Sequence, residues 1–109
     1  MIETQDYTTE KLLAGMMITN HLALAAGTYY RGQNLVWNGT NNNYEDAAGA
    51  TPDAIYIGEE VTFALATKST LMIWGEVQLE GLVNGSNVAI GTLTDAQIKA
   101  YQDNGIFVK

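Results

Sequence analysis

The sequence predicts a small, mostly β (β-rich α+β) single domain of short strands, with one C-terminal helix and an extended N-terminal arm. Three observations lead to this prediction. The chain has 109 residues, which fits one domain. From Met16 onward, apolar runs alternate with turn residues at intervals of about ten residues, which is the spacing of a mostly β domain. Charged residues make up only 16% of the sequence and glycine occurs 11 times, unlike a long helix or coiled coil.

Residues 1–13 are expected to form a flexible arm that precedes the β-rich domain at 14–109. The arm is polar and has no sustained hydrophobic period, so it has little apolar surface to bury alone. Such a segment either frays or becomes ordered by pairing with a neighbour. Its residues alone favour the frayed terminus.

The stretch from Leu12 to Tyr30 carries no formal charge and resembles, at first sight, a membrane span or an export signal. Its centre is the polar sequence Thr19-Asn20-His21, which would be costly to bury in hydrocarbon. The residues before it are acidic, whereas a secretory signal begins with positive charge. We therefore expect a pair of buried strands here and no contact with a membrane.

Two shorter strands are predicted at 35–37 and from Val61 to Leu65. Asn38-Gly39 follows the first of them and accepts the positive φ angles of a tight hairpin turn, while the asparagines at 41–43 make a longer loop the alternative. In the second strand the odd-numbered residues are apolar and the even-numbered ones are small or polar, which predicts one apolar face.

A longer strand is predicted after residue 70. Its odd-numbered residues from Leu71 to Leu79 are apolar apart from Gly75, which predicts a bulge or kink. Met72 and Trp74 lie on the other face and would be exposed in a monomer if the odd-numbered residues face the core. An exposed aromatic residue beside a methionine suggests a subunit interface. The alternative is that the domain covers both faces of this sheet itself.

One helix is predicted, beginning after Thr94. Thr94 and Gln97 form a capping-box pattern, and Asp95 in the first turn suits the positive end of the helix dipole. Asn104-Gly105 is expected to end the helix. The apolar residues 106–108 then predict a short strand that anchors the tail in a sheet.

Charge and missing residue types exclude several function classes. With 12 acidic and 5 basic residues the net charge is −7, which argues against an unaided grip on nucleic-acid phosphates. The absence of cysteine excludes disulfides, a thiol nucleophile and cysteine-bound zinc. His21 is the only histidine, so a catalytic triad and a separate histidine metal site cannot coexist. We expect His21 to be packed or at an interface, and we expect no enzyme, no cofactor and no metal.

Several carboxylates and aromatic residues offer alternative chemistry. Five acidic residues lie at 45–60, where we expect a solvated rim; paired metal-binding carboxylates are the alternative, without a calcium-loop spacing. A glycosidase would need two carboxylates at a fixed distance from each other. The positions of the acidic residues in the sequence do not define such a distance. The candidate pairs are Glu76 with Glu80 and Asp53 with Glu59. The residues that would form a platform for sugar rings are Tyr29, Tyr30, Trp37 and Trp74.

Six short sequences occur in a definite order along the chain. They are Leu12-Leu13-Ala14-Gly15, Leu24-Ala25-Ala26-Gly27, Tyr30-Arg31-Gly32 with Leu35, Pro52-Asp53-Ala54-Ile55, Gly75-Glu76-Val77, and Gly105-Ile106-Phe107-Val108-Lys109. In their order and spacing they resemble the head decoration proteins of tailed bacteriophages, over nearly the whole chain. Tyr29-Tyr30 and the asparagine-rich loop at 38–43 depart from the pattern of that family.

The resemblance implies a lambda-like structural virion protein. Such proteins bind as homotrimers to the outside of the expanded phage head, at three-fold and quasi-three-fold positions. Their N-terminal arm pairs with the major capsid protein and clamps adjacent capsomers against the pressure of packaged DNA. By resemblance, the capsid contact falls on Ile2, Thr4, Tyr7, Thr8 and Thr9.

The resemblance also implies a location. The protein would be made in the cytoplasm of the host bacterium and would end on the outer surface of the head, without direct contact to nucleic acid. We expect the acidic stretch at 45–60 on the solvent side. An alternative from another class is a carbohydrate-binding or adhesive module on the virion surface.

Overall fold

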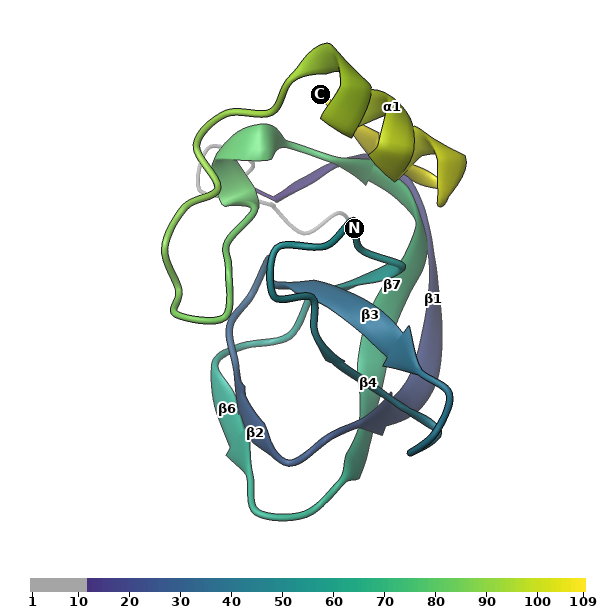
Figure 1. Cartoon of the computed structure of the whole chain (residues 1–109), viewed down its shortest axis with the longest axis vertical. Helices are drawn as coiled ribbons and strands as arrows, with labels where there is room; N and C mark the ends of the chain where they lie inside the picture. Colours follow the sequence, from purple (N-terminus) through teal and green to yellow (C-terminus); the bar gives the residue numbers. More distant parts are fainter. Residues whose placement is uncertain (1–11) are drawn as a thin grey trace, which may run out of the picture.

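The computed structural model describes residues 12–109 (Figure 1). The predicted fold class is confirmed, since the described chain is a mostly β domain with one α-helix near its C-terminus. Leu12 and Leu13, the last two residues of the expected arm, are respectively buried in the core and the first residue of a strand. The residues expected to contact the capsid lie outside the described residues: Ile2, Thr4, Tyr7, Thr8 and Thr9.

The elements alternate short strands with turns until the helix near the end of the chain. In chain order they are β1 (Leu13–Leu24), β2 (Gly27–Tyr29), β3 (Asn34–Asn38), β4 (Asn43–Asp46), β5 (Ala54–Tyr56), β6 (Val61–Phe63), β7 (Thr67–Val77), the 3₁₀ helix η2 (Leu79–Gly81), α1 (Asp95–Asp103) and β8 (Ile106–Val108). Figure 1 shows α1 at the top of the molecule, whereas β2 and β6 lie together at the lower left.

Five strands close on themselves in the order β1-β4-β3-β5-β7, because β7 pairs back onto β1. The β1–β7 ladder is antiparallel and runs from Leu13 opposite Val77 to Leu24 opposite Thr67. In contrast, β1 meets β4 only where Leu24 lies opposite Tyr44. β8 adds to β7 in parallel, and β2 and β6 form a separate antiparallel pair. The result is a small barrel with one extra strand at the C-terminal end of β7.

Two hydrophobic cores lie on opposite faces of the β5–β7 sheet. Ile55 and Met72 are register partners in the first core, and Tyr56 and Leu71 are register partners in the second. Successive residues of a strand point to opposite faces, so both faces are filled. The first core includes Tyr101 from α1. The domain therefore covers both faces of this sheet itself, as the alternative interpretation of the sequence had it.

The expectation that Met72 is exposed is wrong. Met72 is 0% exposed and packs in the first core. The reason is that both faces of the sheet are packed, with Met72 in the first core and its neighbour Leu71 in the second. In addition, Ile18 and Thr19 pair with Trp74 and Met72, which leaves Ile73 as an extra residue between them. An odd-and-even rule fails at such an irregularity. Trp74 remains partly exposed, at 37%.

β1 is not the buried strand that the uncharged sequence suggested. Leu24 is its one buried residue, while Met16 is 71% and Ile18 53% exposed. Most of β1 forms a ribbon with β7 whose residues are largely exposed within residues 12–109. Gly75, where a bulge was predicted, lies opposite Met17 beside a second register shift, with a φ of 146°.

The loop after β3 follows the longer of the two alternatives. β3 ends at Asn38, whose partner Asn43 opens β4, so residues 39–42 form the loop. The Asn38 side-chain oxygen accepts hydrogen bonds from the backbone N–H groups of Thr40 and Asn41. These bonds stabilise the wider loop in place of a two-residue turn.

β6 is shorter than the strand predicted from its alternating pattern. Val61 and Phe63 pack against the second core, as the pattern indicates. Leu65 lies beyond the end of β6 and is 77% exposed. The apolar face therefore ends at Phe63.

The predictions for the C-terminal segment are confirmed. The Thr94 hydroxyl accepts a hydrogen bond from the backbone of Gln97, and the Gln97 side chain accepts one from the backbone of Thr94, which is a complete capping box. Gly105 follows the helix with a φ of 87°. Ile106 then opens β8, which pairs with β7, so the tail is anchored in the sheet.

Candidate functional site

An apolar surface lies on the β1–β7 ribbon and is formed by Met16, Ile18 and Trp74, here called the β1 surface. Ile18 and Trp74 are direct partners in the ladder, so their side chains share a face. The Trp74 ring packs edge-on against Phe107, with ring centroids 5.4 Å apart. It also covers Gly105, where an added Cβ would lie 2.7 Å from Trp74 Cδ1. Trp74 is therefore held in place while part of its ring faces solvent.

Within residues 12–109, the outer edge of β1 has no strand beside it along most of its length. Among residues 12–109, the segment from Ala14 to Ala23 pairs with β7 alone, and β4 takes over only at Leu24. An open edge presents a row of backbone N–H and C=O groups to which another strand can add. This edge also carries no formal charge, since no Asp, Glu, Lys or Arg occurs in β1. Charge on an edge strand commonly prevents strand addition, and that protection is missing here.

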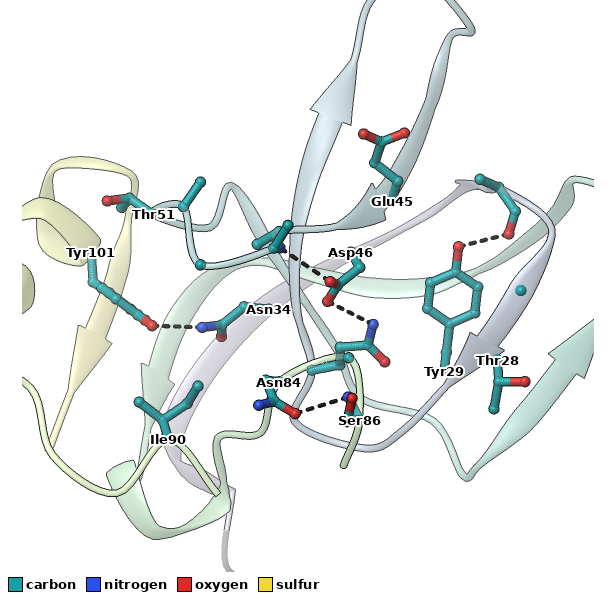
Figure 2. A pocket seen from close by; sticks show the side chains of 18 of the residues that line it. Thr28, Tyr29, Asn34, Glu45, Asp46, Thr51, Asn84, Ser86, Ile90 and Tyr101 are labelled. Carbon is teal, nitrogen blue, oxygen red and sulfur yellow. Dashed lines mark hydrogen bonds between the residues drawn. The ribbon is translucent and has the colours of Figure 1, made fainter. Parts of the chain in front are cut away.

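A polar groove of about 970 Å³ lies on another part of the molecule (Figure 2). It is bordered by the start of β2, the loop after β4 and the turn at 84–86, and Tyr101 reaches it from α1. Figure 2 shows Asn34 and Tyr101 facing each other, with Asp46 beside them and Ser86 opposite. These residues are far apart in the sequence, and the barrel brings them together.

The pair of Asn34 and Tyr101 is buried at this groove. Asn34 Nδ2 donates a hydrogen bond to Tyr101 Oη over 2.6 Å. Burial raises the pKa of the Tyr101 hydroxyl, and the hydrogen bond from Asn34 offsets only part of that rise. Asn34 Oδ1 is buried and has no hydrogen-bond partner among the described residues.

The groove has a negative electrostatic character. Asp46 Oδ1 accepts from Gln33 Nε2 at 3.0 Å and its Oδ2 accepts from the backbone of Ala48 at 3.1 Å. Glu45 lies next to it and accepts a hydrogen bond from Asn38 Nδ2. Burial raises the pKa of the Tyr29 hydroxyl, and the two carboxylates raise it further. None of the described residues that line the groove is Lys, Arg or His.

No protein-family model, no curated protein and no solved structure matches the chain. Within residues 12–109, no helix has the length and apolar character needed to cross a membrane. The same part of the chain holds no cluster of three or more His, Asp or Glu side chains placed to bind a metal ion.

The paired carboxylates considered from the sequence have other contacts. Glu76 forms an ion pair with Lys109, with 3.4 Å between Oε1 and Nζ, and Glu80 is exposed in η2. Asp53 accepts hydrogen bonds from the backbone of Trp37 and from the Asn104 side chain, which ties the loop before β5 to its neighbours. Asp53 thereby has a structural role.

The aromatic residues considered as a platform for sugar rings differ in their exposure to solvent. Tyr29 is 3% exposed and donates its hydroxyl to the carbonyl of Ala25, so its ring is not available for stacking. Trp37 is 46% exposed and packs edge-on against Tyr44. His21, expected to be packed or at an interface, is exposed on β1 opposite Thr70.

The acidic stretch at 45–60 is only partly the solvated rim that the sequence predicts. Asp53, Glu59 and Glu60 are exposed, whereas Glu45 and Asp46 are half-buried at the groove. Sequence reasoning missed the groove, and no local pattern marks Asn34 as a buried group. Its burial depends on Tyr101, which comes from the other end of the chain.

Proposed function

We propose that the chain is a structural virion protein that binds as a homotrimer to the outside of the expanded phage head and stabilises the capsid against internal DNA pressure. The observation that carries the proposal is the β1 surface, where Ile18 and Trp74 form an exposed cross-strand pair beside an uncharged open edge. The resemblance of the sequence to head decoration proteins supplies the partner, which is the major capsid protein of the same phage.

The β1 surface suits a protein contact better than free solvent. Exposed large apolar side chains next to each other favour association, because contact removes their surface from water. Trp74 is held by Phe107 and Gly105, so it loses little conformational freedom on binding. Aromatic residues of this kind often dominate the binding energy of an interface. The surface can serve either the trimer or the capsid contact.

A capsid clamp also fits the small size of the surface. Many copies on one lattice add their contributions, so each contact can be weak and still stabilise the shell. Strand addition supplies main-chain hydrogen bonds with little demand on side chains. Such a role requires no catalytic group and places the protein on the outer surface of the virion.

Binding to heads tests the proposal directly. Purified protein is mixed with expanded, undecorated heads, and the bound fraction and the melting temperature of the heads are measured. We expect saturable binding and a raised melting temperature, and Ile18→Ser should weaken binding. Leu65→Ser is the matched control, because Leu65 is a more exposed apolar residue, at 77%, outside the β1 surface. Absence of binding to the cognate heads would refute the proposal.

A truncation tests the role of the arm. Removing residues 1–11 should weaken head binding without unfolding the domain, whereas a cut after residue 13 would also remove Leu12, which is 2% exposed in the first core. Circular dichroism and sedimentation equilibrium separate loss of fold, loss of the trimer and loss of binding. Unchanged head binding by the shorter chain would show that the arm is not the capsid contact.

The second candidate is a carbohydrate-binding or adhesive surface module, favoured by the exposed ring of Trp37. Trp37 is 46% exposed and is held by Tyr44, as a stacking residue for a sugar would be. A glycan array distinguishes this candidate: saturable binding that Trp37→Ala abolishes would support it over the capsid role.

A further inference from the structure

The chain contains three Asn-Gly dipeptides, at 38–39, 84–85 and 104–105. In such a dipeptide the backbone nitrogen of the glycine can attack the side-chain carbonyl carbon of the asparagine, because glycine has no side chain to hinder the approach. The attack closes a five-membered succinimide ring and releases ammonia. In a folded protein the reaction depends on what holds the side-chain amide and the glycine N–H. These restraints differ among the three sites.

Asn84 and Gly85 lie in the turn after η2, where both reacting nitrogens lack hydrogen bonds. Asn84 is exposed. Within residues 12–109, neither Nδ2 of Asn84 nor the backbone N–H of Gly85 takes part in a hydrogen bond. The nitrogen that attacks and the nitrogen that leaves can therefore move without the loss of a bond to the protein.

The side-chain oxygen of Asn84 is held by two backbone donors. Its Oδ1 accepts from the N–H of Ser86 at 2.8 Å and from the N–H of Val88 at 3.1 Å, and the first of these bonds is drawn in Figure 2. This oxygen carries the negative charge of the tetrahedral intermediate that forms when the ring closes. Donors that are already in place stabilise such a charge, as in an oxyanion hole. The turn therefore favours attack at this carbonyl carbon.

Asn38 has the same kind of donors but a more restrained amide. Its Oδ1 accepts from the backbone N–H groups of Thr40 and Asn41. However, its Nδ2 donates to Oε1 of Glu45 at 3.0 Å, and the residue is half-buried where β3 meets β4. This hydrogen bond must break before ammonia can leave, so we expect Asn38 to react more slowly than Asn84.

Asn104 is the most restrained of the three. Its Nδ2 donates to the carbonyl of Pro52 at 2.9 Å, and the N–H of Gly105 donates to the carbonyl of Gln102 at 2.9 Å. The attacking and the leaving nitrogen are thus both engaged. Gly105 also has the φ of 87° that ends the helix, and its peptide cannot rotate without disturbing that end. We expect the folded chain to protect Asn104.

We infer that Asn84 is a site of spontaneous deamidation in the folded protein. The Gly85 nitrogen forms a bond to Cγ of Asn84 and gives its proton to water, while the bond from Cγ to Nδ2 breaks and ammonia leaves. One water molecule then opens the ring at either carbonyl, which produces aspartate or isoaspartate at position 84. The inference goes beyond the proposed function and does not depend on it.

The product would change the rim of the polar groove. Gly85 lies against Asp46, since an added Cβ would be 2.8 Å from Asp46 Oδ1. A new carboxylate at position 84 adds one negative charge to a chain of net charge −7 and places it near Asp46. Isoaspartate also lengthens the main chain by one methylene, next to the bridge between Val83 and Ala89. We therefore expect the modified turn to move away from the groove.

Trypsin cleaves after Lys and Arg and thus separates the three dipeptides into the peptides 32–68, 69–99 and 100–109. The full chain is kept at neutral pH, either folded or unfolded in urea, and mass spectrometry measures the loss of each amide with time. In urea we expect similar rates at the three sites. In the folded chain Asn84 should react about tenfold faster than Asn104, with Asn38 between them. Isoaspartate should appear in peptide 69–99, because only the succinimide route produces it.

Two variants test the assignment. Asn84→Gln should abolish the modification of peptide 69–99, since the longer side chain cannot form the five-membered ring. Glu45→Ala frees Nδ2 of Asn38 and should raise the rate at Asn38 by about three- to tenfold, with the rate at Asn84 unchanged. If Glu45→Ala fails to fold, all three rates will approach those in urea, and the comparison within the unsubstituted chain still decides.

Two results would overturn the inference. The first is a folded chain in which Asn84 keeps its amide as long as Asn104 does. The second is a modified peptide 69–99 that contains aspartate without isoaspartate. Head binding plays no part in these measurements, so its failure would leave them unchanged.

Discussion

Asn34 and Tyr101 form a buried hydrogen bond that connects β3 with α1 across 67 positions of the chain. The hydroxyl of Tyr101 accepts the Asn34 amide over 2.6 Å. Tyr101→Phe keeps the ring in the first core but leaves that amide without its partner, so we expect a loss of about 1–3 kcal/mol in the free energy of unfolding. Urea denaturation measures it. Tyr30→Phe, at a half-buried position, should change stability by less than about 0.5 kcal/mol; equal losses would argue against the bond.

Gly32 is the position where a side chain fits least. Its φ is +91°, and an added Cβ would lie 1.9 Å from the carbonyl oxygen of Gly81. We expect Gly32→Ala to cost more than about 3 kcal/mol, because backbone strain adds to steric overlap. Gly49 is the matched control: its φ is +89°, with nothing within 4 Å of the added Cβ, so Gly49→Ala should cost about 1–2 kcal/mol. Similar melting temperatures for the two variants would contradict this account.

Stability should fall at alkaline pH. Burial is the largest cause of the raised pKa in four tyrosine hydroxyls: Tyr29, Tyr44, Tyr56 and Tyr101. The folded state binds these protons more tightly than the unfolded chain, so their contribution is complete below the unfolded pKa of about 10 and is lost as the pH rises through the folded values. Urea denaturation together with tyrosinate absorbance should show both changes. A free energy of unfolding that stays constant above pH 10 would exclude the effect.

Because Met72 is buried, we expect its substitution to reduce the stability of the fold and not the association of subunits. Met72→Ala should cost about 2–5 kcal/mol in the free energy of unfolding, because it leaves a cavity in the first core. Met16→Ala, at a residue 71% exposed, should change it by less than about 0.5 kcal/mol. The comparison is made by urea denaturation of the two single variants. A stable Met72→Ala variant with altered self-association would restore the interface interpretation.

The parts of the fold that depend on neighbours in the sequence could be predicted. The Thr94–Gln97 capping box spans three residues, and Gly105 supplies a left-handed backbone directly after the helix. Both are local requirements that the sequence must meet wherever the helix packs. The same holds for the apolar face of Val61 and Phe63.

Burial could not be predicted where it depends on distant elements. Met72 is covered because Tyr101 and Leu12 come from opposite ends of the chain to the same core. β1 is exposed although it is uncharged, because its outer edge has few neighbours among the described residues. The groove could not be predicted for the same reason. Asn34, Asp46 and Tyr101 come together only when the barrel closes.

The pairing of β7 with both ends of the chain has a consequence for synthesis. β7 takes β1 as a neighbour along its length and β8 at its C-terminal end. The barrel therefore cannot close until residue 77 has left the ribosome, and the first core stays incomplete until Ile106 follows. Folds dominated by such long-range pairings form slowly. The nascent chain thus exposes the apolar residues of the first core until Ile106 has emerged, and chaperones are the expected safeguard during that interval.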